Sequence, residues 1–210
     1  MIRERVLSLI APLHRKYRMQ KCDLFFKSLE PQPGDSMLDV GGGAGVTGEF
    51  AGLYRYFCEV HVVILCSQEF AGEGFGNVRF VIGDGCSLPF PNRSFDWVFS
   101  NAVIEHAGGA ERQKQFAGEI QRVARREYFV ATPNRNFPLD PHTLLPFYQF
   151  LSPRLQRRVC RFSPGYWREY EPLDLLSQHD LSNLFPGSEV RKTGMAALPN
   201  NLVAYRRLAS

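Results

Sequence analysis

The chain has 210 residues, of which 44% are hydrophobic and 22% charged, with a formal net charge of +4. This length suits one domain with a sizeable core, and no apolar run approaches the roughly 18 residues of a membrane-spanning helix. The first residues lack the apolar stretch of a signal peptide. The charge is too mild to argue for nucleic acid, and five scattered cysteines without a metal-binding spacing suit a reducing compartment. We therefore expect a single cytoplasmic domain over 1–210.

The first 34 residues are predicted to be helical. Apolar side chains recur at helical spacing over 2–30, in two pieces separated by Pro12, because proline disfavours a helix interior. The cluster of proline and glycine at 31–35 ends the second piece.

A glycine-rich turn follows the first predicted strand, Met37–Val40. Glycines stand at alternate positions, Gly41, Gly43 and Gly45, and a helical pattern comes next. Glycine lets a ligand approach the backbone closely, and ligands of open α/β sheets bind at the carboxyl ends of such strands. The segment therefore predicts a strand, a ligand-binding turn and a helix.

Two familiar ligands fit this turn poorly. A phosphate-binding loop needs Gly-Lys-Ser/Thr after the turn, which is missing. The dinucleotide pattern G-x-G-x-x-G fits 43–48, but its first glycine comes late and it leaves Asp39 unexplained. The pattern D-x-G-x-G-x-G, in contrast, resembles that of class I S-adenosylmethionine-dependent methyltransferases. This resemblance implies that Gly41, Gly43 and Gly45 pass beneath the methionine part of the cofactor. It also implies that Asp39 helps to hold the cofactor's amino group.

The second predicted strand, 59–65, departs from that family. Relatives end this strand with an acid that binds both ribose hydroxyls, but the matching position here is Leu65. An apolar side chain cannot accept those hydrogen bonds, each worth roughly 0.5–1.5 kcal/mol. Glu69, just beyond, is one substitute, with Gln68 or water as others.

The third strand, 78–82, leads into Gly83–Pro91, which resembles the family's G-D-A-x-x-L-P-F stretch. The resemblance implies that Asp84 accepts a hydrogen bond from the adenine amine and that the next amide, of Gly85, meets a ring nitrogen. A plain turn aspartate is the alternative.

The fourth strand, 94–101, ends in a segment that matches the family's S-N-x-x-x-E-H. The backbone of Asn101 and Ala102 would meet the methionine end of the cofactor. His106 is then the nearest titratable group, and an imidazole suits a general base. The alternative is a structural histidine at a helix start.

A helix over 110–124 and a fifth strand over 127–132 precede a long insert, 133–187. Its first residues resemble one group of bacterial methyltransferases. Because the insert starts at the carboxyl edge of the sheet, we expect Asn134 and Asp140 to bind substrate and His142 to face His106 as a second catalytic histidine. Alternatively, Asp140 caps a helix near His142 and both side chains face solvent.

A basic amphipathic helix is predicted to begin at Pro153. Four arginines share one face and three apolar residues the other: Arg154, Arg157, Arg158 and Arg161 against Leu155, Val159 and Phe162. An ordinary surface helix and a lid for an acidic or lipid-like substrate at a membrane surface both fit.

A last helix, 174–185, and two strands, 189–193 and 202–206, complete the pattern. We expect a Rossmann-like α/β fold: a seven-stranded, mostly parallel sheet with one antiparallel strand, helices on both faces and a helical insert after strand five. The resemblance implies that 1–34 forms a cap over the cofactor and 133–187 the lid on the acceptor. A plain packing helix is the alternative for 1–34.

The expected activity is methyl transfer from S-adenosylmethionine to a small-molecule or lipid-linked acceptor, at oxygen. Nucleic acid is not expected as acceptor, because the N/D-P-P-Y/F motif after strand four, a suitably placed Pro-Cys and an aromatic-basic platform are missing. A contact with a membrane surface is compatible with the insert. The alternative, suggested by Leu65, is a regulatory subunit that keeps the fold without turnover.

Overall fold

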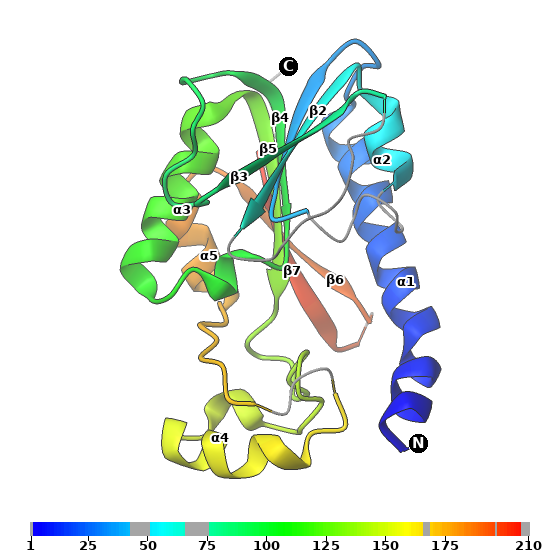
Figure 1. The fold of residues 1–210 in the computed structure, drawn as a ribbon, viewed down its shortest axis with the longest axis vertical. Coiled ribbons are helices and arrows are strands. Elements are labelled where there is room, and N and C mark those ends of the chain that lie inside the picture. Colours follow the sequence, from blue (N-terminus) through cyan, green and yellow to red (C-terminus); the bar gives the residue numbers. More distant parts are fainter. Residues whose placement is uncertain (1, 43–50, 66–75, 166–168, 196, 207–210) are drawn as a thin grey trace.

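A computed structural model describes residues 2–42, 51–65, 76–165, 169–195 and 197–206. Its centre is a seven-stranded sheet in the order β3-β2-β1-β4-β5-β7-β6 (Figure 1). The strands are β1 (Ser36–Val40), β2 (Glu59–Leu65), β3 (Val78–Gly83), β4 (Phe95–Asn101), β5 (Ala124–Pro133), β6 (Glu189–Gly194) and β7 (Pro199–Tyr205). Only β7 runs against the others, pairing antiparallel with both β5 and β6. The predicted mostly parallel sheet with one antiparallel strand is confirmed.

Helices cover both faces of the sheet, as predicted (Figure 1). On one face lie α1 (Ile2–Leu29) and α2 (Ala51–Tyr56), and on the other α3 (Ala110–Val123) and α5 (Gln178–Leu184). Successive strand residues point to opposite faces, so Phe99 packs edge-to-face on Phe25 of α1 while Val98 joins the core beneath Phe116 of α3. The buried strands thus carry apolar side chains on both faces, as a covered parallel sheet requires.

The helix α1 corrects the prediction of two separate pieces. It runs without interruption through Pro12, which removes one backbone hydrogen bond from the ladder but does not end the helix. From Tyr17 to Leu29 one face of α1 is buried on the sheet, and this packing holds the helix together. The first half extends beyond the sheet, and Leu9 there is 79% exposed.

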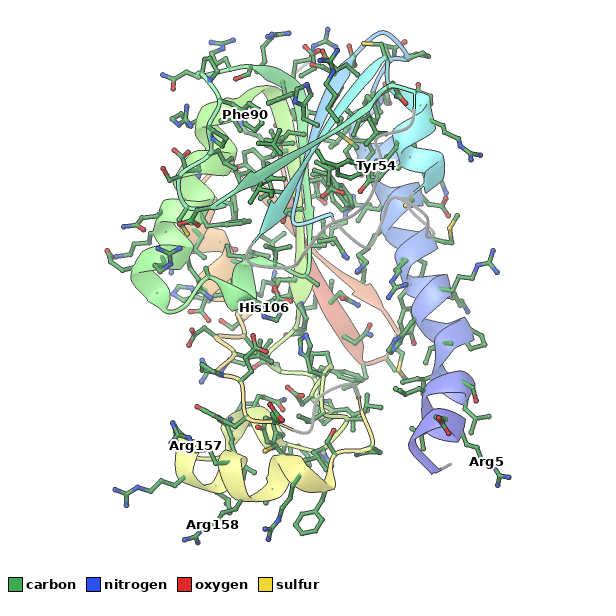
Figure 2. The ribbon with its side chains drawn as sticks, viewed as in Figure 1. Arg5, Tyr54, Phe90, His106, Arg157 and Arg158 are labelled. Atoms are coloured by element: carbon green, nitrogen blue, oxygen red, sulfur yellow. The ribbon has the colours of Figure 1, made fainter. Side chains whose placement is uncertain are left out.

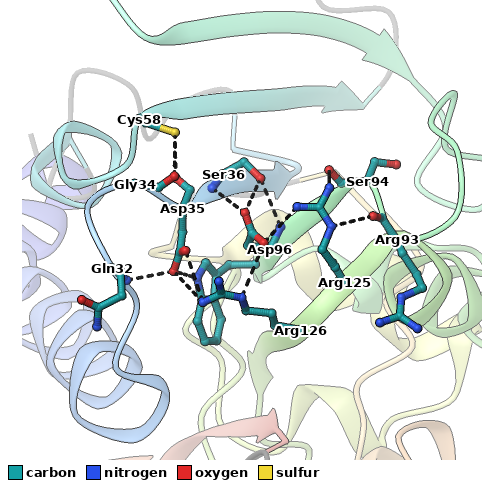
Figure 3. A network of polar contacts seen from close by, with 11 residues as sticks. Gln32, Gly34, Asp35, Ser36, Cys58, Arg93, Ser94, Asp96, Arg125 and Arg126 are labelled. Atoms are coloured by element: carbon teal, nitrogen blue, oxygen red, sulfur yellow. Dashed lines mark hydrogen bonds and ion pairs between the residues drawn. The ribbon is translucent and has the colours of Figure 1, made fainter.

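The amino ends of the central strands are joined by a polar network (Figure 3). The carboxylate of Asp96 in β4 accepts hydrogen bonds from the backbone N–H and the hydroxyl of Ser36 in β1, at 3.0 and 2.9 Å. Arg125 of β5 donates to the same carboxylate at 3.0 Å, and Arg126 lies 3.2 Å from Asp35. These contacts pin β1 beside β4, which is where the strand order reverses. At such a switch point the carboxyl ends of the strands diverge and leave room for a ligand.

The insert between β5 and α5 forms the lower end of the molecule in Figure 1. It holds two short 3-10 helices, Tyr148–Phe150 and Cys160–Phe162, around α4 (Pro153–Val159). The predicted basic helix is present, but α4 buries none of its residues, and two apolar side chains of the predicted helix are exposed, Leu155 at 42% and Phe162 at 69%. The following helix starts at Gln178 rather than 174, because Ser177 and Asp180 form a capping box there.

Candidate active site at the carboxyl ends of β1, β4 and β5

Asp39 lies in β1, directly before the glycine turn. It is buried, and its carboxylate accepts a hydrogen bond from the hydroxyl of Tyr54 in α2. Burial raises the pKa of Asp39 to about 7, because the charged carboxylate is poorly solvated there. An ammonium group beside this carboxylate would offset that cost, which is the role predicted for Asp39.

Gly41 begins the turn with a φ of +89°, a conformation that favours glycine. A Cβ at this position would lie 2.3 Å from a methyl carbon of Val103, so the turn packs directly on the segment after β4. The N–H of Gly41 donates to the carbonyl of Val63 at 2.8 Å. Gly43 and Gly45, the other two predicted glycines, lie outside the described residues.

Leu65 was expected at the ribose and Asp84 at the adenine, and the structure describes the side chain of Asp84 alone. Leu65 ends β2 opposite Gly83, but its side chain lies outside the described part. Asp84 is half exposed and already paired: its carboxylate accepts from Arg112 at 2.9 and 3.0 Å and from the Cys86 N–H at 2.9 Å. These bonds lower the pKa of Asp84. Binding of adenine at Asp84 therefore stays a prediction, and it requires a carboxylate shared with Arg112.

The turn after Gly85 is compact. The Ser87 N–H donates to the carbonyl of Asp84 at 2.9 Å, and this bond closes the turn around the buried Gly85. The predicted contact of Gly85 with the adenine ring stays a prediction.

The end of β4 is strained and braced from α1. Ala102 has a φ of +57°, unusual for a residue with a side chain, and its N–H donates to the carbonyl of Ala131 at 2.8 Å. Asn101 accepts a hydrogen bond from the ammonium of Lys21 at 2.5 Å. Lys21 is only 5% exposed, and burial lowers its pKa to about 8. Strained backbone of this kind persists where the surroundings hold it and is common at functional sites.

Glu105 is completely buried beneath this turn. One carboxylate oxygen, Oε2, accepts from the hydroxyl of Thr132 in β5 at 3.0 Å. The other, Oε1, is buried without a hydrogen-bond partner among the described residues. Burial raises the pKa of Glu105 to about 7, and the nearby ammonium of Lys21 opposes that effect.

The structure brings His106 and His142 together. Their rings meet edge to face with centroids 5.3 Å apart, although they belong to the loops after β4 and after β5. Figure 2 places His106 between the sheet and the insert. Burial lowers the pKa of both imidazoles, that of His142 to about 4, so both are neutral at pH 7. Nδ1 of His106 lies 3.8 Å from the carboxylate of Glu171.

A tight turn positions His142. The buried carboxylate of Asp140 accepts from the His142 N–H at 3.1 Å and from the Thr143 N–H and hydroxyl, both at 2.7 Å. Asp140 therefore holds a turn and not the helix start of the alternative, and it is buried while His142 packs on His106. Substrate binding by Asp140 stays a prediction. Gly165 packs closely on this turn, because a Cβ there would lie 2.2 Å from the carbonyl oxygen of His142.

The side chain of Asn134 forms hydrogen bonds within its own loop and to the neighbouring hairpin. Its amide nitrogen donates to the carbonyl of Pro199 at 2.9 Å, and its amide oxygen accepts from the Asn136 N–H at 3.0 Å. These bonds fasten the start of the insert to the β6–β7 hairpin. Asn134 thus has a structural role, and its predicted contact with substrate stays a prediction.

Sequence reasoning missed several members of this cluster: Lys21, Tyr54, Glu105, Arg112 and Thr132. Lys21 carried a usable signal, since it occupies the buried helical face that runs from Tyr17 to Phe25. A lysine in an apolar stripe indicates a buried charge with a partner. Glu105 stood beside His106 in the E-H motif, but its burial depends on Thr132, which is distant in sequence.

Comparisons with known proteins agree with this geometry. Residues 38–131 match the family described as the methyltransferase domain. The uncharacterized methyltransferase YcgJ of Bacillus subtilis is 29% identical over 123 residues, covering 56% of this chain and 47% of YcgJ. The chain thus matches about half the length of this curated relative.

Two solved structures share the fold. The PH0226 protein of Pyrococcus horikoshii has a TM-score of 0.64 at 19% identity, with 92% of this chain and 91% of that one covered. A chain of the complex between the Haloferax volcanii Trm112 methyltransferase activator and the putative methyltransferase has a TM-score of 0.60 at 13% identity, with 100% and 99% covered. At these identities the likeness concerns the fold.

The match over 38–131 and the shared fold both support a class I S-adenosylmethionine-dependent methyltransferase. S-adenosylmethionine is the cofactor that this match implies. No helix in the described part of the chain is long and apolar enough to cross a membrane.

Proposed function

We propose that the chain transfers a methyl group from S-adenosylmethionine to an oxygen of a small-molecule or lipid-linked acceptor. The observation that carries this proposal is the His106–His142 pair, 5.3 Å between ring centroids, at the carboxyl ends of β4 and β5. In a fold of this class those strand ends face the reacting methyl group. Two neutral imidazoles there suit an acceptor hydroxyl that must lose a proton.

The cofactor would lie across the switch point between β1 and β4. Asp39 would bind its amino group, the glycine turn would pass beneath its methionine part, and Ala102 would meet it from β4. Asp84 and Gly85 would hold the adenine. Leu65 replaces the acid that usually binds the ribose. Glu69 is our candidate for this role.

The transfer itself would be an in-line displacement. The bond between the methyl carbon and the sulfonium sulfur breaks as the bond to the acceptor oxygen forms, and S-adenosylhomocysteine leaves as a thioether. His106 is the candidate base for the hydroxyl proton, with His142 on the opposite wall. Most of the rate enhancement would come from positioning the two reactants.

The insert, 133–187, would close over the acceptor and present the protein to an anionic membrane surface. Five large apolar side chains in the described part of the insert are exposed: Leu139, Phe147, Phe150, Leu155 and Phe162. They share this segment with the arginines of α4, of which Arg158 extends outward in Figure 2, while the guanidinium of Arg157 lies over the ring of Tyr170, 4.8 Å from its centroid. Apolar side chains beside arginines complement the headgroup region of an anionic bilayer. Such docking would suit a lipid-linked acceptor and a cytoplasmic enzyme.

Calorimetric titration and turnover test the proposal together. We expect S-adenosylmethionine to bind at one site per chain, and radioactive methyl to pass to at least one member of a panel of hydroxyl acceptors, free and lipid-linked. His106→Asn should keep the cofactor affinity and lose transfer. Binding without transfer to any acceptor would favour the regulatory subunit, and the absence of binding would overturn both readings.

Vesicle sedimentation tests the membrane contact separately. The chain should sediment with vesicles that contain phosphatidylserine and stay in solution with phosphatidylcholine alone. The double variant Arg157→Glu with Arg158→Glu should remain in solution in both cases. Equal sedimentation of the variant and the natural chain would contradict docking through α4.

A further inference from the structure

Three side chains of the site form a cluster suited to a metal ion. Glu105, His106 and His142 each offer one ligand atom, and these atoms all lie within 4.8 Å of one another. Two come from the loop after β4 and the third from the loop after β5. Carboxylate oxygen and imidazole nitrogen together are typical ligands of divalent first-row metal ions.

The carboxylate supplies a second, independent observation. Glu105 is 0% exposed, and its Oε1 has no hydrogen-bond partner among the described residues. Thr132 binds the other oxygen and thereby fixes the orientation of the carboxylate. A buried oxygen left without a donor is costly, and buried carboxylates usually pair with a cation or coordinate a metal.

We propose that Glu105, His106 and His142 bind one divalent first-row metal ion, such as Mn²⁺, Co²⁺ or Zn²⁺, whose open positions receive the acceptor oxygen. Mg²⁺ fits less well, because it prefers oxygen ligands and water to imidazole. Three protein ligands leave coordination positions free, as in catalytic metal sites. The binding of the ion stands on this cluster alone, while its part in methyl transfer rests on the proposed function.

The ligand atoms need a small closure around the ion. With metal–ligand bonds of about 2.1 Å, neighbouring ligand atoms lie about 3.0–3.4 Å apart in tetrahedral or octahedral sites. The largest separation here is 4.8 Å, so one or two side chains must move inward. Rotation about side-chain bonds of His106, which is only partly buried, supplies such a movement without a change in the fold.

The groups around the cluster fit this role. Nδ1 of His106 lies 3.8 Å from Glu171, and metal-binding histidines commonly direct their second nitrogen to a carboxylate. Asp140 fixes the turn that carries His142. The ammonium of Lys21, a nearby buried cation, donates a hydrogen bond to Asn101. Oε1 of Glu105 accepts no hydrogen bond among the described residues and is open to a metal ion.

The inference changes how the acceptor loses its proton. A hydroxyl bound to a divalent ion has a lowered pKa, so its proton can leave to water without a histidine base. The resulting oxygen then attacks the methyl carbon, the carbon–sulfur bond breaks, and the sulfonium becomes a thioether. The two histidines would serve as ligands in the metal-loaded enzyme.

The test uses Co²⁺ as the probe. The full chain is freed of metal with a chelator and titrated with Co²⁺ without cofactor or acceptor, followed by calorimetry and by visible absorption. We expect one equivalent to bind with a d–d absorption band. Glu105→Gln and His142→Asn should each weaken binding by at least about tenfold, whereas His179→Asn on the exposed side of α5 should bind as the natural chain does.

Circular dichroism and S-adenosylmethionine titration of the same samples separate the outcomes. If Glu105→Gln does not fold, His106→Asn, at a more exposed position, takes its place. Failure of the natural chain to bind Co²⁺, or equal affinity in the ligand variants, would overturn the metal site. Co²⁺ binding by a chain that does not bind S-adenosylmethionine would instead overturn the proposed function and leave the metal site standing.

Discussion

The ammonium of Lys21 lies 2.5 Å from the side-chain oxygen of Asn101, which joins α1 to the end of β4 across eighty positions of the chain. This bond braces the turn at Ala102, where the backbone is strained. The first helix is thus part of the candidate site as well as a cover for the sheet.

Lys21→Met should weaken S-adenosylmethionine binding by about tenfold, or about 1.4 kcal/mol, because the turn at Ala102 loses its brace. Stability in urea should change little, since methionine fills much of the same space and removes a buried charge. Calorimetry and urea unfolding measure the two effects. Lys27→Met, on the exposed side of α1, is the matched control, and equal affinities in the two variants would contradict the brace.

Asp39→Asn should separate stability from cofactor binding. The pKa of Asp39 is about 7 in the folded chain and lies near 4 in the unfolded chain, so folding favours the protonated acid. The stability of the natural chain should therefore fall as pH rises from 4 to 7, by up to about 4 kcal/mol from this group. Asparagine does not titrate, and its amide oxygen can still accept from Tyr54.

Melting temperatures at pH 5 and pH 8 measure this effect. The difference between Asp39→Asn and the natural chain should shift in favour of the variant at pH 8, while S-adenosylmethionine binding by the variant is lost. A constant difference at both pH values would show that Asp39 is charged in the folded chain.

Gly165→Ala tests the close packing of Gly165 on the turn that carries His142. The new Cβ would lie 2.2 Å from the carbonyl oxygen of His142, so the two segments must separate. We expect a loss of about 1–3 kcal/mol in unfolding free energy and altered imidazole signals of His142 and His106 in nitrogen-15 NMR spectra. Gly118→Ala, at an open position on α3, should change neither. Unaltered imidazole signals in the Gly165 variant would show that the turn does not depend on this contact.

Asp84→Ala tests the adenine assignment. Loss of a charged acceptor should weaken S-adenosylmethionine binding by about 1.5–3 kcal/mol. Arg112→Ala should weaken it much less, because it frees Asp84 from a competing partner without removing the acceptor. Calorimetry on both variants decides the point, and a dissociation constant unchanged by Asp84→Ala would make Asp84 a turn residue alone.

Several strands were predictable because each is a short apolar run between turn residues. The second strand was predicted at 59–65 and is found at Glu59–Leu65. Sequence patterns were less reliable where the extent of a helix, or the burial of its side chains, depends on packing. Pro12 was expected to interrupt a helix that continues through it. The exposure of Leu155 and Phe162 also could not be read from the amphipathic pattern alone.

The candidate site was predictable only in part. The D-x-G-x-G-x-G and E-H motifs pointed to the loops after β1 and β4, and the position of the insert pointed to His142. The participation of Lys21 and the burial of Glu105 depend on contacts between segments distant in sequence, which no local pattern records. The structural bond of Asn134 was missed for the same reason, since its partner Pro199 lies in the last hairpin.

A crystal structure with S-adenosylhomocysteine tests the central claim most directly. We predict that the ligand lies across the ends of β1 and β4, with its amino group at Asp39 and its sulfur atom directed toward His106 and His142. A sulfur atom directed away from the pair, or more than about 12 Å from both rings and so beyond a shared pocket of ordinary size, would contradict the account.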